Sequence, residues 1–107
     1  MDFALTEDQL RFKQAAREFL NKEVVPYRAE WDRRESVDPA IIGKLGDLGF
    51  FGLTIPEDYG GLGGDYITYC LGMEELGRAD SAVRGIVSVS MGLFGKSVLS
   101  HGTEEQK

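Results

Sequence analysis

The amino-acid sequence predicts an all-α domain of about five to six helices in an orthogonal or up-down arrangement. Apolar side chains recur at helical spacing in several separate segments. Capping residues, prolines and glycines stand between those segments, where helices begin and end. Only residues 50–55 resemble a strand, and one strand is too few for a stable sheet. The 107 residues are enough for one domain spanning 1–107.

The first helix is predicted to begin at Thr6, because Gln9 three residues later completes a capping box. A single apolar stripe follows at helical spacing, formed by Phe12, Ala15, Ala16, Phe19 and Leu20. The helix should end near Val25, because Pro26 disfavours helical geometry in the residue before it. A second helix is predicted from Pro26 to Glu35, where the run of charges is typical of a solvated face.

Asp38 and Pro39 predict the start of a third helix, and Gly49 is a typical stop. Its buried face should consist of Ile41, Ile42, Leu45 and Leu48. Residues 50–55 (FFGLTI) are interpreted as an extended crossing segment or a lone strand. The following PEDYGGLGG, residues 56–64, lacks the Lys-Ser/Thr of a phosphate-binding loop and carries two acids. It is therefore interpreted as a tight turn.

A fourth helix is expected from Asp65 to about Arg78, with an inward face made of Ile67, Cys70, Leu71 and Leu76. Cys70 is interpreted as a packed core residue. The adjacent carboxylates Glu74 and Glu75 lie about 100° apart around a helix. That geometry argues against a catalytic carboxylate pair acting on one atom.

The longest predicted helix runs from Asp80 to Gly102 and is apolar around nearly its whole circumference, which predicts a buried helix. The uncharged run between Arg84 and Lys96 is shorter than the roughly 20 residues of a membrane span, so we expect no membrane span. Several glycines lie within this helix, each costing about 1 kcal/mol relative to alanine. They indicate that a neighbouring helix or a ligand approaches the backbone closely.

The formal net charge of −6 argues against a nucleic-acid partner and against an anionic membrane surface. One cysteine cannot form an internal disulfide, and no targeting signal is visible at the N-terminus. These features predict a cytoplasmic protein, or a mitochondrial-matrix protein if it is eukaryotic and already processed. Residues 103–106 repeat the capping-box pattern immediately before the last residue. We therefore expect the chain to be a segment of a longer protein.

Four motifs occur in a characteristic order: LTEDQ, LGDLGFFGLTIPEDYGGLGGD, MEELGRADSAVR and HGTEEQK. Together they resemble the helical N-terminal domain of the acyl-CoA dehydrogenases over essentially all 107 residues. The resemblance implies an FAD enzyme that removes two hydrogens across the α and β carbons of an acyl-CoA thioester. It also implies electron transfer to an electron-transfer flavoprotein, and assembly as a homotetramer or dimer.

In that family the catalytic base and most flavin contacts belong to a middle β-domain and a C-terminal helical domain. The resemblance therefore implies no catalytic and no cofactor-binding residue in this chain, which alone should be inactive. The N-terminal domain supplies one wall of the acyl pocket. By position, the lining residues are Gly85, Val89 and Leu93, which form one helical row.

Arg84 and Ser88 lie one turn apart on the same predicted helix. A buried guanidinium needs an acceptor, and a carboxylate at the far end of an acyl chain is one candidate. The pattern DSxxRxxxS resembles the glutaryl-CoA dehydrogenase branch and relatives acting on dicarboxylyl thioesters, where the matching residues bind the distal carboxylate. The chain departs from that branch at Gly77, where the branch tends to carry an acid, so methylsuccinyl- or benzylsuccinyl-type substrates fit equally.

Four alternatives stay open at this point. Arg84 could instead pair with Asp80, Glu74 or Glu75, or contact other domains. The substrate could then be a plain short- or medium-chain acyl-CoA. The enzyme could be an acyl-CoA oxidase, which shares this domain but usually carries a longer N-terminal region. A non-enzymatic helical interaction module is the remaining alternative.

Overall fold

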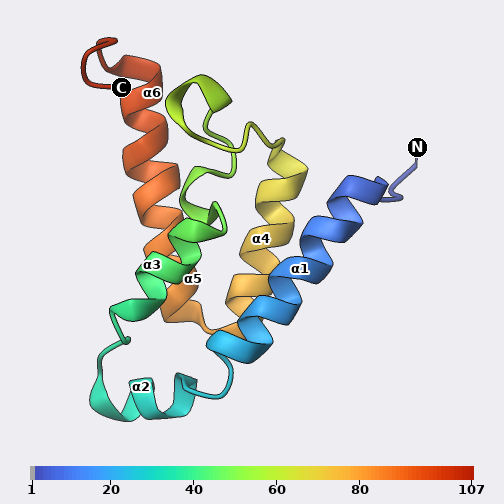
Figure 1. Cartoon of the computed structure of the whole chain (residues 1–107), viewed down its shortest axis with the longest axis vertical. Coiled ribbons are helices and arrows are strands. Elements are labelled where there is room, and N and C mark those ends of the chain that lie inside the picture. Colours follow the sequence, from blue (N-terminus) through green and yellow to red (C-terminus); the bar gives the residue numbers. More distant parts are fainter. Residues whose placement is uncertain (1) are drawn as a thin grey trace.

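The computed structural model describes residues 2–107 and contains helices, turns and loops but no strand within that range (Figure 1). This confirms the predicted all-α class. The α-helices are α1 (Glu7–Glu23), α2 (Arg28–Arg34), α3 (Ala40–Asp47), α4 (Tyr66–Ala79), α5 (Ser81–Val87) and α6 (Lys96–His101). Two short 3₁₀ helices, η1 (Phe50–Gly52) and η2 (Glu57–Tyr59), interrupt the α3–α4 connection, and a π-helical segment, η3 (Ser88–Gly95), joins α5 to α6.

The predicted capping box opens α1. The backbone N–H of Gln9 donates to Thr6 Oγ1 at 3.2 Å, and the backbone N–H of Thr6 donates to Gln9 Oε1 at 2.9 Å. The Gln9 amide also donates to Asp65 Oδ2 at 3.2 Å, and Asp65 itself caps α4 by accepting from the Thr68 N–H at 2.8 Å. The first turns of α1 and α4 are thus fixed to each other.

The core lies where α1 and α4 run side by side, with α5 and η1 packed onto them (Figure 1). Phe50 is its largest fully buried side chain, and its ring centroid lies 6.2 Å from those of Phe12 and Phe19. Both partner rings come from the predicted stripe of α1. The remaining buried members are small or aliphatic, apart from Trp31 and Met91.

The prediction of an extended segment or strand at residues 50–55 is wrong. Gly49 adopts a left-handed conformation (φ 83°), as expected of a helix stop. The chain then coils into consecutive i to i+3 turns, in which Gly52 N–H donates to Gly49 O and Ile55 N–H donates to Gly52 O. Gly49 permits the left-handed turn that starts this coiling, and Gly52 gives room to the backbone of Gly61, 3.1 Å from the position of a Cβ there. The coiling turns Phe50 and Leu53 into the core.

The predicted inward face of α4 is half right. Leu71 and Leu76 are buried, but Ile67 and Cys70 are exposed. The Asp65 cap sets a register in which positions 72, 75, 76 and 79 face α1 and the core. Ile67 and Cys70, spaced i and i+3, lie together outside it. In α3, Ile42 and Leu48 are likewise exposed, whereas Ile41 and Leu45 are buried.

α5, η3 and α6 form one continuous helix, Ser81–His101, along one side of the domain (Figure 1). The expectation that it is buried all round is wrong, because only Val83, Val87 and Met91 are fully buried. Its 21 residues, with a mean hydropathy of 1.3 and 17% burial in the most apolar window, satisfy the length and composition of a membrane span. Helices of soluble domains can meet the same length and composition criteria, so one such helix is weak evidence for a membrane span.

Candidate acyl-group surface

The exposed side of helix Ser81–His101 is the open apolar surface of interest. Val89 is 54% exposed, Leu93 69% and Phe94 71%. Gly85 lies one turn before Val89, and a Cβ atom built on it would meet no atom within 4 Å. The structure thus brings the predicted row of Gly85, Val89 and Leu93 to an open helix face rather than into the core. Exposed aliphatic side chains in one row, with an exposed aromatic residue next to them in the sequence, indicate a surface that another group covers.

The π-helical segment Ser88–Gly95 falls in the middle of this surface. π-helical turns are rare and occur frequently at functional sites. Glycines at positions 92 and 95 lower the steric cost of widening the helix here. The Ser88 hydroxyl donates to Gly85 O at 3.3 Å, so it remains on the helix with its lone pairs available. Nothing in the sequence periodicity predicted this segment.

Arg84 precedes this row and is partly buried. Within residues 2–107 its guanidinium makes no ion pair and no side-chain hydrogen bond. The predicted alternative of a salt bridge to Asp80, Glu74 or Glu75 is therefore not the arrangement in this domain. The Arg84 stem instead lies against Gly77 of α4, with Cδ 3.4 Å from the position of a Cβ there.

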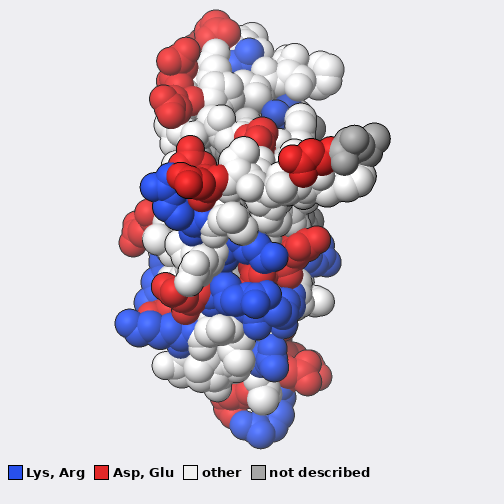
Figure 2. Space-filling view, turned by 90° about the vertical axis from the view of Figure 1, so that its right-hand side faces the viewer, with Lys and Arg blue, Asp and Glu red and all other residues white. Residues whose placement is uncertain are grey.

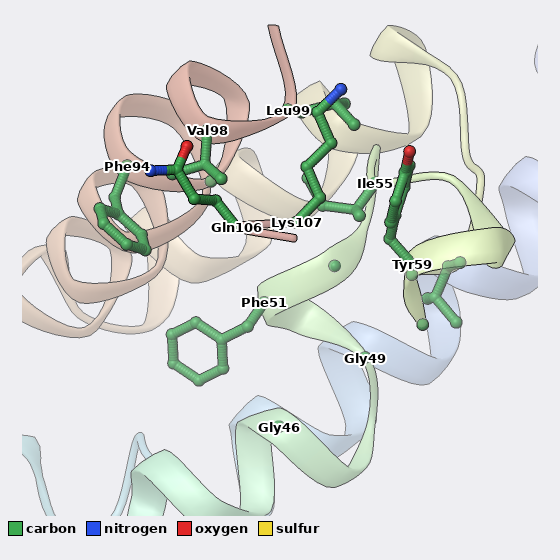
Figure 3. Close-up of a pocket in the computed structure, with 15 residues that line it drawn as sticks. Gly46, Gly49, Phe51, Ile55, Tyr59, Phe94, Val98, Leu99, Gln106 and Lys107 are labelled. Atoms are coloured by element: carbon green, nitrogen blue, oxygen red, sulfur yellow. The ribbon is translucent and has the colours of Figure 1, made fainter. Parts of the chain in front are cut away.

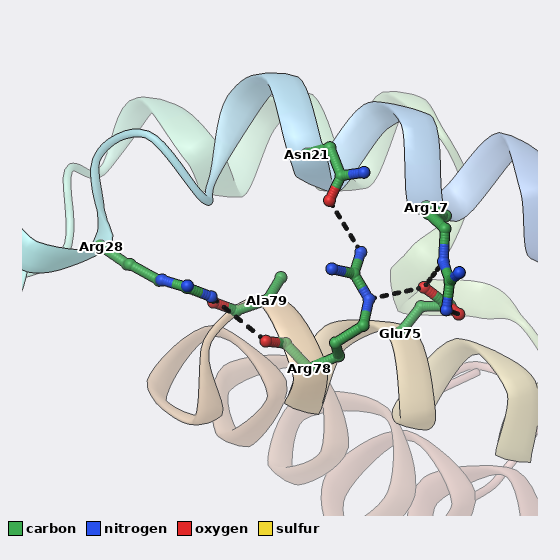
Figure 4. A network of polar contacts seen from close by, with 6 residues as sticks. All are labelled: Arg17, Asn21, Arg28, Glu75, Arg78 and Ala79. Atoms are coloured by element: carbon green, nitrogen blue, oxygen red, sulfur yellow. Dashed lines mark hydrogen bonds and ion pairs between the residues drawn. The ribbon is translucent and has the colours of Figure 1, made fainter.

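The Glu75 carboxylate accepts hydrogen bonds from two arginines other than Arg84 (Figure 4). Arg17 of α1 donates to both carboxylate oxygens at 3.0 and 2.9 Å, and Arg78 Nε donates to Oε2 at 3.1 Å. Arg78 also donates to Asn21 Oδ1 at 2.9 Å. Burial raises the pKa of Glu75, but the hydrogen bonds and charges of Arg17 and Arg78 outweigh it and hold that pKa below its usual value.

This network links α1 to α4 and has a structural role. Arg28 extends it, because its Nη1 donates to the carbonyl oxygen of Ala79 at 2.9 Å and so satisfies the last turn of α4. Figure 2 shows the corresponding face, where basic side chains form a band with acidic side chains among them. Sequence reasoning missed the burial of Glu75; the signal was its position on the α4 face that carries Leu71 and Leu76.

A separate cavity of about 420 Å³ lies between η1, the loop after it and α6 (Figure 3). Its apolar wall includes Phe51, Ile55, Phe94 and Val98. Near its rim, Tyr59 donates its hydroxyl to Glu104 Oε2 at 2.7 Å, a hydrogen bond that raises the pKa of Tyr59. Gly85, Val89 and Leu93 do not line this cavity, whereas Phe94 of the open helix surface does. Six glycines line the cavity, at positions 46, 49, 52, 60, 61 and 95.

The glycine-rich loop offers no cradle for the pyrophosphate of a flavin cofactor. The backbone N–H groups of residues 60–64 all donate to carbonyl oxygens of residues 52–57, at 2.7–3.1 Å. A Cβ on Gly61 would lie 2.0 Å from Ile55 O, which shows how closely the loop folds onto itself. The loop is thus the tight turn that the sequence predicted, and it does not fit a cofactor phosphate. Among residues 2–107, no group of three His, Cys, Asp or Glu side chains is placed to hold a metal ion.

Comparison with known proteins shows to which family this domain belongs. Residues 6–107 match the family described as "Acyl-CoA dehydrogenase, N-terminal domain". The chain is 38% identical over 107 residues to the "Acyl-CoA dehydrogenase, short-chain specific" of Clostridium acetobutylicum, covering 100% of this chain and 28% of that protein. The chain therefore belongs to the acyl-CoA dehydrogenase N-terminal domain family, and it spans 28% of the length of that relative.

Two solved structures share the fold. Butyryl-CoA dehydrogenase from Megasphaera elsdenii superposes with a TM-score of 0.92 at 36% identity, over 99% of this chain and 28% of that one. The glutaryl-coenzyme A dehydrogenase glutaryl-CoA complex gives a TM-score of 0.92 at 32% identity, over 98% of this chain and 27% of that one. The comparisons thus support the family but do not favour the glutaryl branch that the pattern around Arg84 resembles.

Proposed function

We propose that this chain is the N-terminal domain of a longer FAD-dependent acyl-CoA dehydrogenase that acts on short-chain acyl-CoA thioesters. In this role the open side of helix Ser81–His101 forms one wall of the acyl pocket. The observation that carries the proposal is the exposed row of Gly85, Val89 and Leu93 in a domain of this family. Two relatives, at 38% and 36% identity, are named a short-chain specific acyl-CoA dehydrogenase and a butyryl-CoA dehydrogenase.

The domain helps to bind the acyl group and to exclude water from it. An apolar wall removes water from around the α and β carbons, where charge develops as a proton and a hydride leave. In this proposal, other parts of the protein hold the flavin and the base. A bound flavin would supply the hydride acceptor, and an electron-transfer flavoprotein would be the partner that takes up the electrons. We further propose that the protein assembles as a homo-oligomer in the cytoplasm, or in the mitochondrial matrix of a eukaryote.

A second candidate substrate class is favoured by Arg84. Arg84 is partly buried, immediately precedes Gly85 in the helix, and forms no ion pair within residues 2–107. Leaving such a charge without an acceptor is costly, and a planar guanidinium binds a carboxylate with two parallel hydrogen bonds. An acyl group with a distal carboxylate, as in glutaryl-CoA, supplies that acceptor.

Steady-state assays of the full-length flavoprotein with an artificial electron acceptor test both candidates. We expect turnover of butyryl-, pentanoyl- and glutaryl-CoA without oxygen consumption, since oxygen consumption would indicate an oxidase. Arg84→Met should lower kcat/KM for glutaryl-CoA by about 30-fold and leave pentanoyl-CoA within about twofold. Arg11→Met, an exposed arginine at the far end of α1, is the matched control. No turnover of any acyl-CoA contradicts the proposed function, and an equal effect on both substrates contradicts the carboxylate candidate alone.

A further inference from the structure

The cavity between η1, the loop after it and α6 is bordered on one side by Gln106 and Lys107 (Figure 3). Its other walls consist of glycines and of aliphatic and aromatic side chains. Two of these side chains are well exposed, Phe94 at 71% and Leu62 at 50%. An apolar hollow with large exposed side chains at its border is typical of a surface that another group covers. The turn at residues 103–107 indicates which group this is.

Residues 103–107 have the hydrogen bonds of a helix N-terminus. The backbone N–H of Gln106 donates to Thr103 Oγ1 at 3.3 Å, and the backbone N–H of Thr103 donates to Gln106 Oε1 at 2.9 Å. The backbone N–H of Lys107 donates to the Thr103 carbonyl oxygen at 3.1 Å, which is the i to i+4 bond of an α-helical turn. Together these contacts form a second capping box.

The same arrangement opens α1, where residues 6–9 read TEDQ and residues 103–106 read TEEQ. In α1, Thr6 and Gln9 exchange the two capping hydrogen bonds, and the Leu10 N–H donates to the Thr6 carbonyl oxygen at 3.0 Å. From this start α1 continues as an α-helix to Glu23. A capping box satisfies N–H groups that the start of a helix leaves without partners. The box at Thr103 therefore predicts a helix that continues past Lys107.

The first turn of this helix is held at the edge of the cavity. Tyr59 donates its hydroxyl to Glu104 Oε2 at 2.7 Å, and Lys107 Nζ lies 5.8 Å from the centroid of the Tyr59 ring. The Lys107 side chain is only 17% exposed. Because the helix begins beside the hollow, an apolar stripe along it would be buried by packing over Phe94 and Leu62.

We infer that the segment directly following Lys107 in the full-length protein is an amphipathic helix whose apolar side fills this cavity. This inference rests on the proposal that the chain is the N-terminal domain of a longer dehydrogenase. The helix covers Phe94 and Leu62. Gly85, Val89 and Leu93 do not line the cavity and remain the surface for the acyl group.

Photo-cross-linking of the full-length flavoprotein identifies the group that covers the cavity. Phe94 and, in a separate variant, Leu62 are replaced by the photoreactive p-benzoylphenylalanine, which bonds to C–H groups in direct contact with it. Peptide mass spectrometry after irradiation should join both positions to the same chain, within about eleven residues, or three helical turns, after Lys107. The matched control is the same replacement at Ile42, which is 45% exposed in α3 and does not line the cavity. It should give no cross-link to that segment.

A labelling experiment provides a second test with a smaller change. Leu62→Cys and Ile42→Cys replace side chains of nearly equal exposure within residues 2–107. In the full-length flavoprotein, the cysteine at 62 should react with a maleimide about tenfold more slowly or less, because the helix must open before the reagent can reach it. Peptide mapping assigns each reaction to its cysteine, so that Cys70 does not interfere. Equal rates at 62 and 42 would overturn the inference.

The outcomes separate this inference from the proposed function. Cross-links from Phe94 and Leu62 to another part of the chain, to a second subunit or to nothing overturn the inference, even if the enzyme oxidises butyryl-CoA. The predicted cross-links in a full-length protein that turns over no acyl-CoA contradict the proposed function and leave the inference standing.

Discussion

Replacing Phe50 with alanine should lower the free energy of unfolding by about 3–5 kcal/mol. Phe50 is 2% exposed, and its ring lies between those of Phe12 and Phe19. The left-handed turn at Gly49 fixes where it enters the core, so the surrounding helices cannot easily close the space that alanine leaves. The cost thus includes both the lost burial and a residual cavity.

Urea unfolding of the domain, followed by far-ultraviolet circular dichroism, measures this effect. Phe3→Ala is the matched control, because Phe3 is 83% exposed and its truncation should change the free energy of unfolding by at most about 0.5 kcal/mol. A Phe50 variant as stable as the Phe3 variant would contradict the placement of η1 in the core.

Replacing Glu75 with glutamine should lower the free energy of unfolding by about 2–3 kcal/mol. The residue is 2% exposed and accepts three charge-assisted hydrogen bonds, two from Arg17 of α1 and one from Arg78 of α4. Glutamine keeps the volume but places an amide donor against two arginines. The same urea titration applies, with Glu74→Gln as control, because Glu74 is exposed on the neighbouring position of the helix. Equal stability of the two variants would show that the network is weak.

The same carboxylate gives the stability a pH dependence of known sign. The native pKa of Glu75 lies below its ordinary value of 4.5, so its stabilisation is complete above that value. The stabilisation is lost as the pH falls through the native pKa. The wild-type domain should thus lose more stability between pH 6 and pH 3 than the Glu75→Gln variant. Parallel curves for the two proteins would contradict the assignment.

Local sequence signals predicted most helix boundaries correctly. The capping box at Thr6 has its predicted partner, and α4 begins at the predicted Asp65, because helix starts depend on residues only a few positions apart. The strand prediction at 50–55 failed because the left-handed turn at Gly49 leads the chain into successive i to i+3 turns, whereas apolar content alone suggests extension. Exposure of Cys70 was also missed, since the register of α4 depends on its packing against α1.

The candidate site was predictable only in part. The spacing of Gly85, Val89 and Leu93 placed them on one helix face, and they lie on the open side. Whether that side was open or buried could not follow from an apolar composition, which is the same for a core helix and for a wall covered by other groups. The Glu75 network was missed for a related reason. The amino-acid sequence does not distinguish a buried glutamate from a solvated one, because burial depends on whether a neighbouring helix places arginines beside the carboxylate.

We propose that the open side of helix Ser81–His101 receives the acyl group, and a substitution of Gly85 tests this proposal most directly. A side chain at this position enters empty space, with no atom of residues 2–107 within 4 Å of its Cβ. Gly85→Val in the full-length flavoprotein should therefore leave the thermal midpoint nearly unchanged and lower kcat/KM for butyryl-CoA by about tenfold or more. Gly43→Val, at an equally open helix position in α3, should change neither. Wild-type kcat/KM for the Gly85 variant across all acyl chain lengths would contradict the account.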